Sequence, residues 1–299
     1  MQIMAAPSTK PPEAAPMDDA PLAIVCGGGA FPPAVARAAE MAGRRVVMFP
    51  LRGFAGEEIE AWPHAWVHLG QFGRLTTELR RHGCRDVVFI GTVLRPRIRD
   101  LRLDLAGLRR LPRVFGMLRG GDNHLLSSVG QLFEEEGFRL LGAHEVAPGI
   151  LAPAGSLAGA RPSADDSADI AVGQQALEAL SPFDIGQAVV VINGHVVAVE
   201  AAEGTDLMLA RCAELRTIGR LKTPLGRGVL VKLPKRGQDR RFDLPSLGPR
   251  TVEGVAKAGL AGIAVEAGGV IVTDTAELVR AADAAGVFLV GLPPVSLTS

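Results

Sequence analysis

The segment from Val231 to Thr251 holds the densest group of residues that could do chemistry in this chain. It reads VKLPKRGQDRRFDLPSLGPRT, with a local excess of four positive charges, although the whole chain has 32 Lys+Arg and 32 Asp+Glu. Its charged residues are Lys232, Lys235, Arg236, Asp239, Arg240, Arg241, Asp243 and Arg250. Such a segment suits a polyanionic ligand, and carboxylates inside it suit a metal ion or an acid–base step. The alternative is a solvated basic turn.

Three carboxylates surround a glycine turn further upstream. They are Glu200, Glu203 and Asp206. Side by side they would repel one another unless a cation neutralised part of the charge, and Mg²⁺ prefers such oxygens. Together with Asp239 and Asp243 they would form an acidic floor beneath a basic rim, which is what hydrolysis of a pyrophosphate requires. The simpler interpretation is that Thr205 or Asp206 caps the helix that follows.

A glycine turn follows the first predicted strand, Leu22–Cys26, and precedes a helix predicted over 34–42. It consists of Gly27, Gly28 and Gly29. Backbone N–H groups of such a turn can approach a phosphate. The spacing matches neither the dinucleotide fingerprint nor the P-loop, which disfavours a nucleotide-dependent oxidoreductase. Two interpretations stay open: a turn that binds a phosphate or a uridine, and a tight turn chosen for packing.

The elements that must position these residues fall into two halves. Strand, glycine turn, helix and strand alternate from residue 22, with further strands expected at 66–69, 86–91 and 138–143, which predicts a Rossmann-like α/β domain. Asn193-Gly194 between two β-branched runs predicts an antiparallel hairpin and therefore a distinct, mixed α+β second half. We assign 1–20 to a disordered leader, 21–150 to the Rossmann-like N-terminal domain, 151–169 to a linker and 170–299 to a C-terminal catalytic domain.

Composition bounds the class of protein. With 299 residues, of which 47% are hydrophobic, the chain can bury real cores. No apolar run reaches the roughly 18 to 20 residues of a membrane span, and the leader lacks the features of a signal peptide. Three widely spaced cysteines, Cys26, Cys84 and Cys212, predict reduced, buried thiols. Reduced thiols are typical of a cytoplasmic protein, which we therefore expect. A pI near 7.0 argues against a general nucleic-acid binder, so we expect no nucleic-acid partner.

Six short motifs, in the same order, resemble a known family. They are LAIVCGGGAFP at 22–32, LGQFGRL at 69–75, LRGGD at 118–122, FDIGQAVVV at 183–191, VEAAEGTD at 199–206 and the 231–251 segment. Together they resemble the two-domain UDP-2,3-diacylglucosamine pyrophosphatases of lipid A biosynthesis, the type found in bacteria that lack the calcineurin-like version. The likeness covers residues 22–294, nearly all of the chain apart from the leader.

The resemblance implies a cytoplasmic, Mg²⁺-dependent hydrolase that converts UDP-2,3-diacylglucosamine into 2,3-diacylglucosamine 1-phosphate (lipid X) and UMP. It also implies a Rossmann-like N-terminal domain, a distinct C-terminal domain, a substrate held between them and a homodimer. The family's essential aspartate falls on Asp243, in the run Arg241-Phe242-Asp243-Leu244-Pro245. One departure is Asn123, which stands where a second aspartate is expected after Asp122.

The residues and the resemblance together give a set of expected roles. The expected catalytic residues are Asp243, Lys232, Lys235 and Arg241, and the expected Mg²⁺ ligands are Asp243 and Asp206. The expected substrate-binding residues are Gly27, Gly28, Gly29, Gln71, Asp122, Glu203, Thr205, Asp206, Gln238 and Arg240. The competing hypothesis is a non-catalytic sensor of a nucleotide sugar or polyphosphate that uses the same basic segment.

A basic, leucine-rich helix is expected over residues 101–117. It suits peripheral contact with the anionic surface of the inner membrane, where a substrate with two acyl chains would reside. An ordinary basic surface helix explains the same pattern equally well, so both interpretations stay open.

Overall fold

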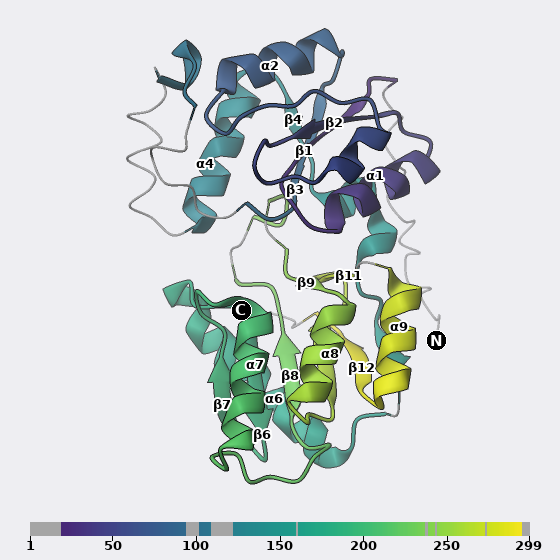
Figure 1. Cartoon of the computed structure of the whole chain (residues 1–299), viewed down its shortest axis with the longest axis vertical. Coiled ribbons are helices and arrows are strands. Elements are labelled where there is room, and N and C mark those ends of the chain that lie inside the picture. Colours follow the sequence, from purple (N-terminus) through teal and green to yellow (C-terminus); the bar gives the residue numbers. More distant parts are fainter. Residues whose placement is uncertain are drawn as a thin grey trace, which may run out of the picture.

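The computed structural model describes residues 19–93, 102–108, 122–159, 161–236, 239–242, 244–272 and 274–294, with the backbone alone for 122–127. Figure 1 shows two units, each built on its own sheet, with the chain passing between them more than once. The predicted leader lies outside the described residues except for Asp19 and Ala20. The α/β class and the two-part architecture predicted from the sequence are confirmed.

The N-terminal unit contains a four-stranded parallel sheet in the order β2-β1-β3-β4. Its strands are β1 (Leu22–Cys26), β2 (Val46–Pro50), β3 (Asp86–Ile90) and β4 (Arg139–Leu140). Its helices are α1 (Phe31–Met41), α2 (Phe72–Arg81), α4 (Asp122–Glu135) and α5 (Ala143–Val146), with short 3₁₀ turns at Glu57–Ala61 and Pro148–Ile150. Every residue of β1 is buried, which is typical of a central strand covered on both faces.

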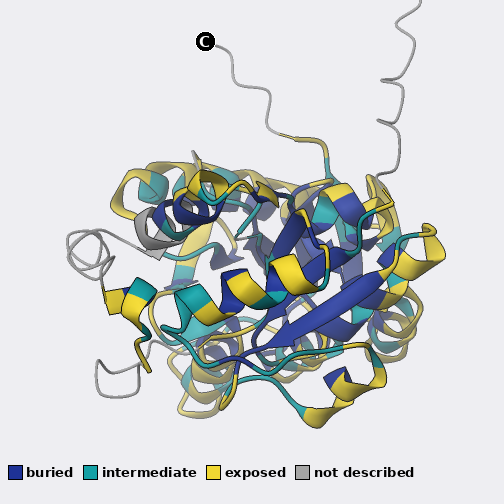
Figure 2. Ribbon diagram, turned by 90° about the horizontal axis from the view of Figure 1, so that it is seen from above, coloured by how far each residue is buried: buried dark blue, intermediate teal, exposed yellow. Residues whose placement is uncertain are grey.

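Alternate residues of β1 belong to the two apolar layers of this unit. Leu22 and Ile24 pack in the layer that includes α1, whereas Ala23 and Val25 pack in the layer that includes Leu79 of α2 and Phe133 of α4. This period of two follows from the pleat of a strand. Seen from above in Figure 2, the strands are dark blue, and the surrounding helices carry exposed, yellow residues.

The C-terminal unit contains a six-stranded mixed sheet in the order β5-β12-β10-β8-β6-β7. Its strands are β5 (Gly155–Ala158), β6 (Ala188–Ile192), β7 (His195–Val199), β8 (Val229–Lys232), β10 (Gly262–Glu266) and β12 (Phe288–Leu292). Strands β8, β10 and β12 run parallel, and β5 and β6 pair antiparallel with their neighbours. A separate two-stranded parallel sheet joins β9 (Ser246–Leu247) to β11 (Ile271–Val272).

Helices cover both faces of the larger sheet. Helix α6 (Ala164–Leu180) packs on one face through Ile170 and Leu177. The opposite face is covered by α7 (Gly204–Thr217), α8 (Pro249–Lys257) and α9 (Thr275–Ala285). A 3₁₀ turn, η4 (Ser181–Phe183), follows α6.

One prediction about a strand is wrong. The strand expected at 66–69 is absent: within this described stretch only Val67 forms an isolated bridge, to Leu51. The segment 151–169, which we assigned to a linker, contains β5 at residues 155–158, which pairs with β12, and the start of α6 at Ala164. The Rossmann-like label of the first domain stays a prediction.

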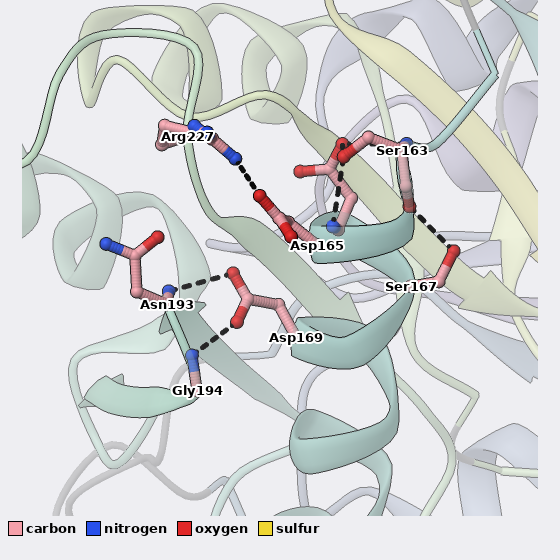
Figure 3. A network of polar contacts seen from close by, with 8 residues as sticks. Ser163, Asp165, Ser167, Asp169, Asn193, Gly194 and Arg227 are labelled. Atoms are coloured by element: carbon pink, nitrogen blue, oxygen red, sulfur yellow. Dashed lines mark hydrogen bonds and ion pairs between the residues drawn. The ribbon is translucent and has the colours of Figure 1, made fainter.

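The predicted hairpin is confirmed, and a buried carboxylate of α6 holds its turn (Figure 3). Asn193 and Gly194 have φ values of 51° and 76°, as a two-residue turn that fits strand twist requires. Their N–H groups donate to the Asp169 carboxylate, with N···O distances of 3.0 and 2.6 Å. Asp169 is only 3% exposed, so these hydrogen bonds satisfy a charge that would otherwise be costly to bury.

The three cysteines are buried and unpaired, as predicted. Burial raises the pKa of Cys26 to about 12 and that of Cys84 to about 11, so both are protonated core thiols. Among the helices that the structure describes, none combines the length and the apolar character needed to cross a bilayer.

Candidate active site between the two sheets

A cavity of about 320 Å³ lies where the two units meet. Its walls come from both units: Phe31, Phe89, Ile90, Gly91, Thr92, Val93 and Ala143 from the N-terminal one, and Arg240, Arg241, Phe242, Leu244, Ser246 and Ile271 from the C-terminal one. The N-terminal wall is the carboxyl end of β3, next to β1. In the order β2-β1-β3-β4 this is the point where the strand order reverses, which is where open parallel sheets bind ligands.

The basic segment crosses from the larger sheet to the N-terminal unit and back (Figure 1). It leaves β8 at Lys232 and reaches the N-terminal core with Phe242, whose ring centroid lies 5.7 Å from that of Phe89. It then packs Leu244 against the α1 layer and returns through β9. The segment therefore forms a wall of the interdomain cavity and is not a solvated turn.

The positive charges of this segment are balanced by acids from other elements. The ion pairs join Lys235 to Asp184, Arg236 to Glu178, Arg240 to Glu266, Arg250 to Asp206, and Arg241 to both Asp239 and Glu134. The hydrogen bond between Arg241 and Asp239 lowers the pKa of the Asp239 carboxyl and raises the pKa of the Arg241 guanidinium. The segment thus presents arginines held in fixed orientations rather than an unbalanced positive rim.

The three upstream carboxylates do not converge on one point. Glu200 accepts from Thr205, Glu203 pairs with Arg211, and Asp206 pairs with Arg250 at 3.0 Å. Nowhere in the described part of the chain do three His, Cys, Asp or Glu side chains gather closely enough to hold a metal ion. The predicted acidic floor is therefore not built by these three residues, since arginines pair with Glu203 and Asp206, and Glu200 accepts hydrogen bonds from Thr205 and Gln187.

Lys232 lies at the carboxyl end of β8 and is only 6% exposed. Its Nζ donates to Thr205 Oγ1 at 2.9 Å, and the Thr205 hydroxyl donates to Glu200 Oε1 at 2.7 Å. A buried ammonium needs polar partners, because leaving it alone in an apolar environment would be costly. Lys232 is thus part of a series of hydrogen-bonded side chains at the end of the sheet.

The amides of Gly27 and Gly28 bond within the N-terminal unit. The Gly27 N–H donates to Ile90 O at 3.1 Å and the Gly28 N–H to Thr92 O at 2.9 Å, so neither amide points to a ligand. A Cβ at Gly27 would lie 2.3 Å from Thr92 O, which requires glycine there. The first turn of α1 contains Pro32 and Pro33, which have no N–H to offer an anion. The packing interpretation of Gly27 and Gly28 is therefore favoured over phosphate binding.

The remaining predicted residues are spread over several places. Arg240 and Arg241 line the cavity. The Gln71 side-chain oxygen accepts from the His68 N–H at 3.2 Å, just before α2. Asp122 begins α4, and its side chain, like Asp243 and Gln238, lies outside the described residues.

Sequence reasoning missed several residues around the cavity. Phe31, Phe89 and Thr92 looked like ordinary strand and helix-start residues, and no local pattern marked them. His144 follows the cavity residue Ala143, and its Nδ1 is buried without a hydrogen-bond partner among the described residues. Burial lowers the pKa of His144, and nearby Arg240 lowers it further against the opposing effect of Glu145, so the ring is neutral.

A second hollow, of about 470 Å³, lies at the start of α6. Figure 3 shows the polar contacts of residues around it. Its polar groups already serve the fold. Ser163 and Asp166 cap α6 reciprocally, and Arg227 pairs with Asp165. These contacts stabilise the first turn of α6, so we do not assign a reaction to this hollow.

Comparisons with known proteins agree with the motifs. Residues 21–150 match the model of the LpxI N-terminal domain, and residues 153–290 match that of the LpxI C-terminal domain. The chain is 42% identical over 273 residues to the UDP-2,3-diacylglucosamine pyrophosphatase LpxI of Caulobacter vibrioides. The alignment covers 91% of this chain and 98% of that protein. The resemblance drawn from the six motifs is confirmed, and the chain belongs to the LpxI family.

Proposed function

We propose that this protein hydrolyses UDP-2,3-diacylglucosamine to UMP and 2,3-diacylglucosamine 1-phosphate (lipid X) in lipid A biosynthesis. The family membership and the printed activity of the Caulobacter relative support the reaction. The observation that carries the proposal is the position of the basic segment, which walls the interdomain cavity at the ligand-binding end of a parallel sheet.

The cavity combines the two kinds of surface that a lipid nucleotide requires. Arg240 and Arg241 supply guanidinium groups, and Phe31, Phe89 and Phe242 supply apolar rings. The ion pairs to Glu266 and Glu134 fix these arginines before any ligand arrives. An arginine in an ion pair retains further N–H donors, so it can still bind phosphoryl oxygens.

In the proposed reaction, Lys232, Lys235, Arg240 and Arg241 neutralise the diphosphate. Asp243 orients a water molecule and accepts its proton. The water oxygen forms a bond to one phosphorus atom, the bridging P–O bond breaks, and the two monophosphates separate.

Mg²⁺ belongs to the same proposal. Mg²⁺ is usually held by one or two carboxylates together with substrate phosphates, so Asp243 and the diphosphate itself would hold it. Asp206 fits this role less well, because it pairs with Arg250. When bound, the ion would supply charge neutralisation at the phosphoryl oxygens. We expect EDTA to abolish UMP release and added Mg²⁺ to restore it; full turnover in EDTA would remove the metal from the proposal.

The decisive experiment follows UMP release from UDP-2,3-diacylglucosamine by wild-type protein and by Asp243→Ala. We expect the variant to lose about 10²- to 10⁴-fold in kcat while its circular dichroism spectrum stays that of the wild type. Asp165→Ala, which removes an exposed carboxylate near α6, is the matched control and should retain activity. A sensor would bind the substrate and release no UMP, and substantial turnover by Asp243→Ala would exclude that residue from the reaction.

We further propose a homodimer in the cytoplasm that contacts the inner membrane peripherally, because the substrate carries two acyl chains. Light scattering after gel filtration tests the dimer, and sedimentation with anionic vesicles tests the contact. Of the basic stretch expected at 101–117, the structure describes residues 102–108, with 105–108 helical; the remainder lies outside the described residues.

A further inference from the structure

Building on the proposed hydrolase function, we propose that Glu200 and Thr205 are positioning residues that orient the Lys232 ammonium toward the diphosphate. The three side chains form one chain of hydrogen bonds, from Lys232 Nζ to Thr205 Oγ1 at 2.9 Å and from Thr205 Oγ1 to Glu200 Oε1 at 2.7 Å. The expectation from the sequence was a direct contact between Thr205 and substrate, and the inferred role acts through Lys232 instead.

The chemistry of Lys232, Thr205 and Glu200 determines which group donates and which accepts in each of these hydrogen bonds. An ammonium group only donates, so the Thr205 oxygen must accept from Lys232. The single hydroxyl proton of Thr205 then goes to Glu200, whose carboxylate only accepts when ionised. The Thr205 oxygen therefore accepts from Lys232 while its hydroxyl donates to Glu200, and this arrangement holds one N–H of the ammonium at a defined place.

Glu200, the last side chain in this series of hydrogen bonds, is anchored by the sheet itself. Glu200 follows β7 directly, its N–H donates to Ala188 O at 2.9 Å, and its Oε2 accepts from the Gln187 N–H at 3.0 Å. Strands β8, β6 and β7 are neighbours in the sheet, so the hydrogen bonds from Lys232 to Glu200 span three strands at one edge. Thr205 joins this edge from the first turn of α7 and is 8% exposed.

Burial at this edge indicates function rather than packing alone. A lysine is rarely buried, because its charge is expensive to remove from water, and an apolar residue at the end of β8 would be less costly to bury. Lys232 is the first charged residue of the basic segment, and later residues of that segment, from Arg240 to Ser246, line the cavity. An ammonium fixed before substrate binds loses little freedom in the transition state, which is how preorganised charges accelerate reactions.

The test compares Thr205→Val, Thr205→Ser and Glu200→Gln with the wild type, by steady-state release of UMP from UDP-2,3-diacylglucosamine. We expect Thr205→Val and Glu200→Gln each to lower kcat about 10- to 100-fold with less than about threefold change in KM, because the contact matters most in the transition state. Thr205→Ser keeps the hydroxyl and should retain at least about a third of kcat. The double variant should lose no more than either single one, because both act through one chain.

Matched controls come from the same helix. Thr217→Val removes a hydroxyl bonded to Ala213 O, and Glu214→Gln removes an exposed carboxylate; both should leave kcat unchanged. Thermal unfolding of all variants separates loss of fold from loss of positioning. Wild-type kcat in both folded Thr205→Val and Glu200→Gln would overturn the inference, as would a folded Thr205→Ser as impaired as Thr205→Val. A wild-type protein that releases no UMP would instead remove the proposed function, and the inference with it.

Discussion

Asp86 is a carboxylate that stays ionised although it is only 1% exposed. Burial would raise its pKa, but hydrogen bonds from Arg139 and Arg44 outweigh burial and lower the pKa below the ordinary 3.8. These side chains tie the start of β3 to the start of β4 and to the turn after α1. A group whose pKa is depressed by folding stabilises the fold above its unfolded pKa and loses that contribution as the pH falls through its folded pKa.

We therefore expect Asp86→Asn to lower the free energy of unfolding by about 2 to 3 kcal/mol at neutral pH, since two arginines lose their partner. Urea titrations from pH 7 downward check both the size and the sign. The difference between wild type and variant should shrink as the pH falls below 3.8. Glu253→Ala, which breaks an exposed pair with Lys257, should change little. A difference that grew with acidity would refute this assignment of Asp86.

Residue types were easier to predict than their partners. The basic segment was found by its local excess of charge, yet Arg241 pairs with Glu134, 107 positions away, and Lys235 with Asp184, 51 positions away. A count over a window of sequence cannot include such partners. The segment marked by the charge excess does line the interdomain cavity, but the excess overstated the net charge there.

At the scale of elements, the β6–β7 hairpin depends on a helix that precedes it. Asp169→Ala would leave the N–H groups of Asn193 and Gly194 without their buried acceptor. We expect a loss of about 2 kcal/mol in stability with unchanged kcat, because Asp169 contacts neither the cavity nor the Lys232 chain. Thermal unfolding and UMP release measure the two quantities. Ser167→Ala, two residues away on α6, is the control, and a large loss of kcat in Asp169→Ala would contradict this account.

Elements with a strong local signal were predicted well, and edge elements were not. Asn193-Gly194 specifies its own turn, and Asp274 caps α9 locally, because its side chain accepts from the Glu277 N–H. Strand β5 reads GSLA, a run without β-branched residues, and it exists because β12 offers a free edge to pair with. Val67 lies in an apolar run but finds only Leu51 as a partner. Pairing partners decide such cases, and a single sequence does not contain them.

At the scale of the whole molecule, Phe242 is one of the residues that hold the basic segment on the N-terminal unit. Phe242 packs against α4 at Gly130, where an added Cβ would lie 2.2 Å from Phe242 Cζ. Gly130→Ala should therefore displace Phe242, disturb the cavity wall and lower kcat about 10- to 100-fold while both units stay folded. Gly149→Ala, where the added Cβ meets nothing within 4 Å, is the matched control.

Circular dichroism and UMP release separate the two effects for Gly130→Ala. Wild-type turnover in this variant would show that the position of Phe242 does not matter to the reaction. The apolar walls of the cavity were beyond prediction for the same reason that this contact was: Gly130 and Phe242 carry no sequence signal for one another. Only the folded chain brings α4 and the basic segment together.

The crossing of the basic segment also has a consequence for recombining relatives. A chimera that joined residues 21–150 of this protein to the second half of a homologue would place the homologue's residue, in place of Phe242, against Gly130. A smaller residue than Phe242 would leave a void there, and in the reverse chimera a larger residue at position 130 would collide with the Phe242 ring. Gly130 and Phe242 should therefore be exchanged together, although they belong to different family models.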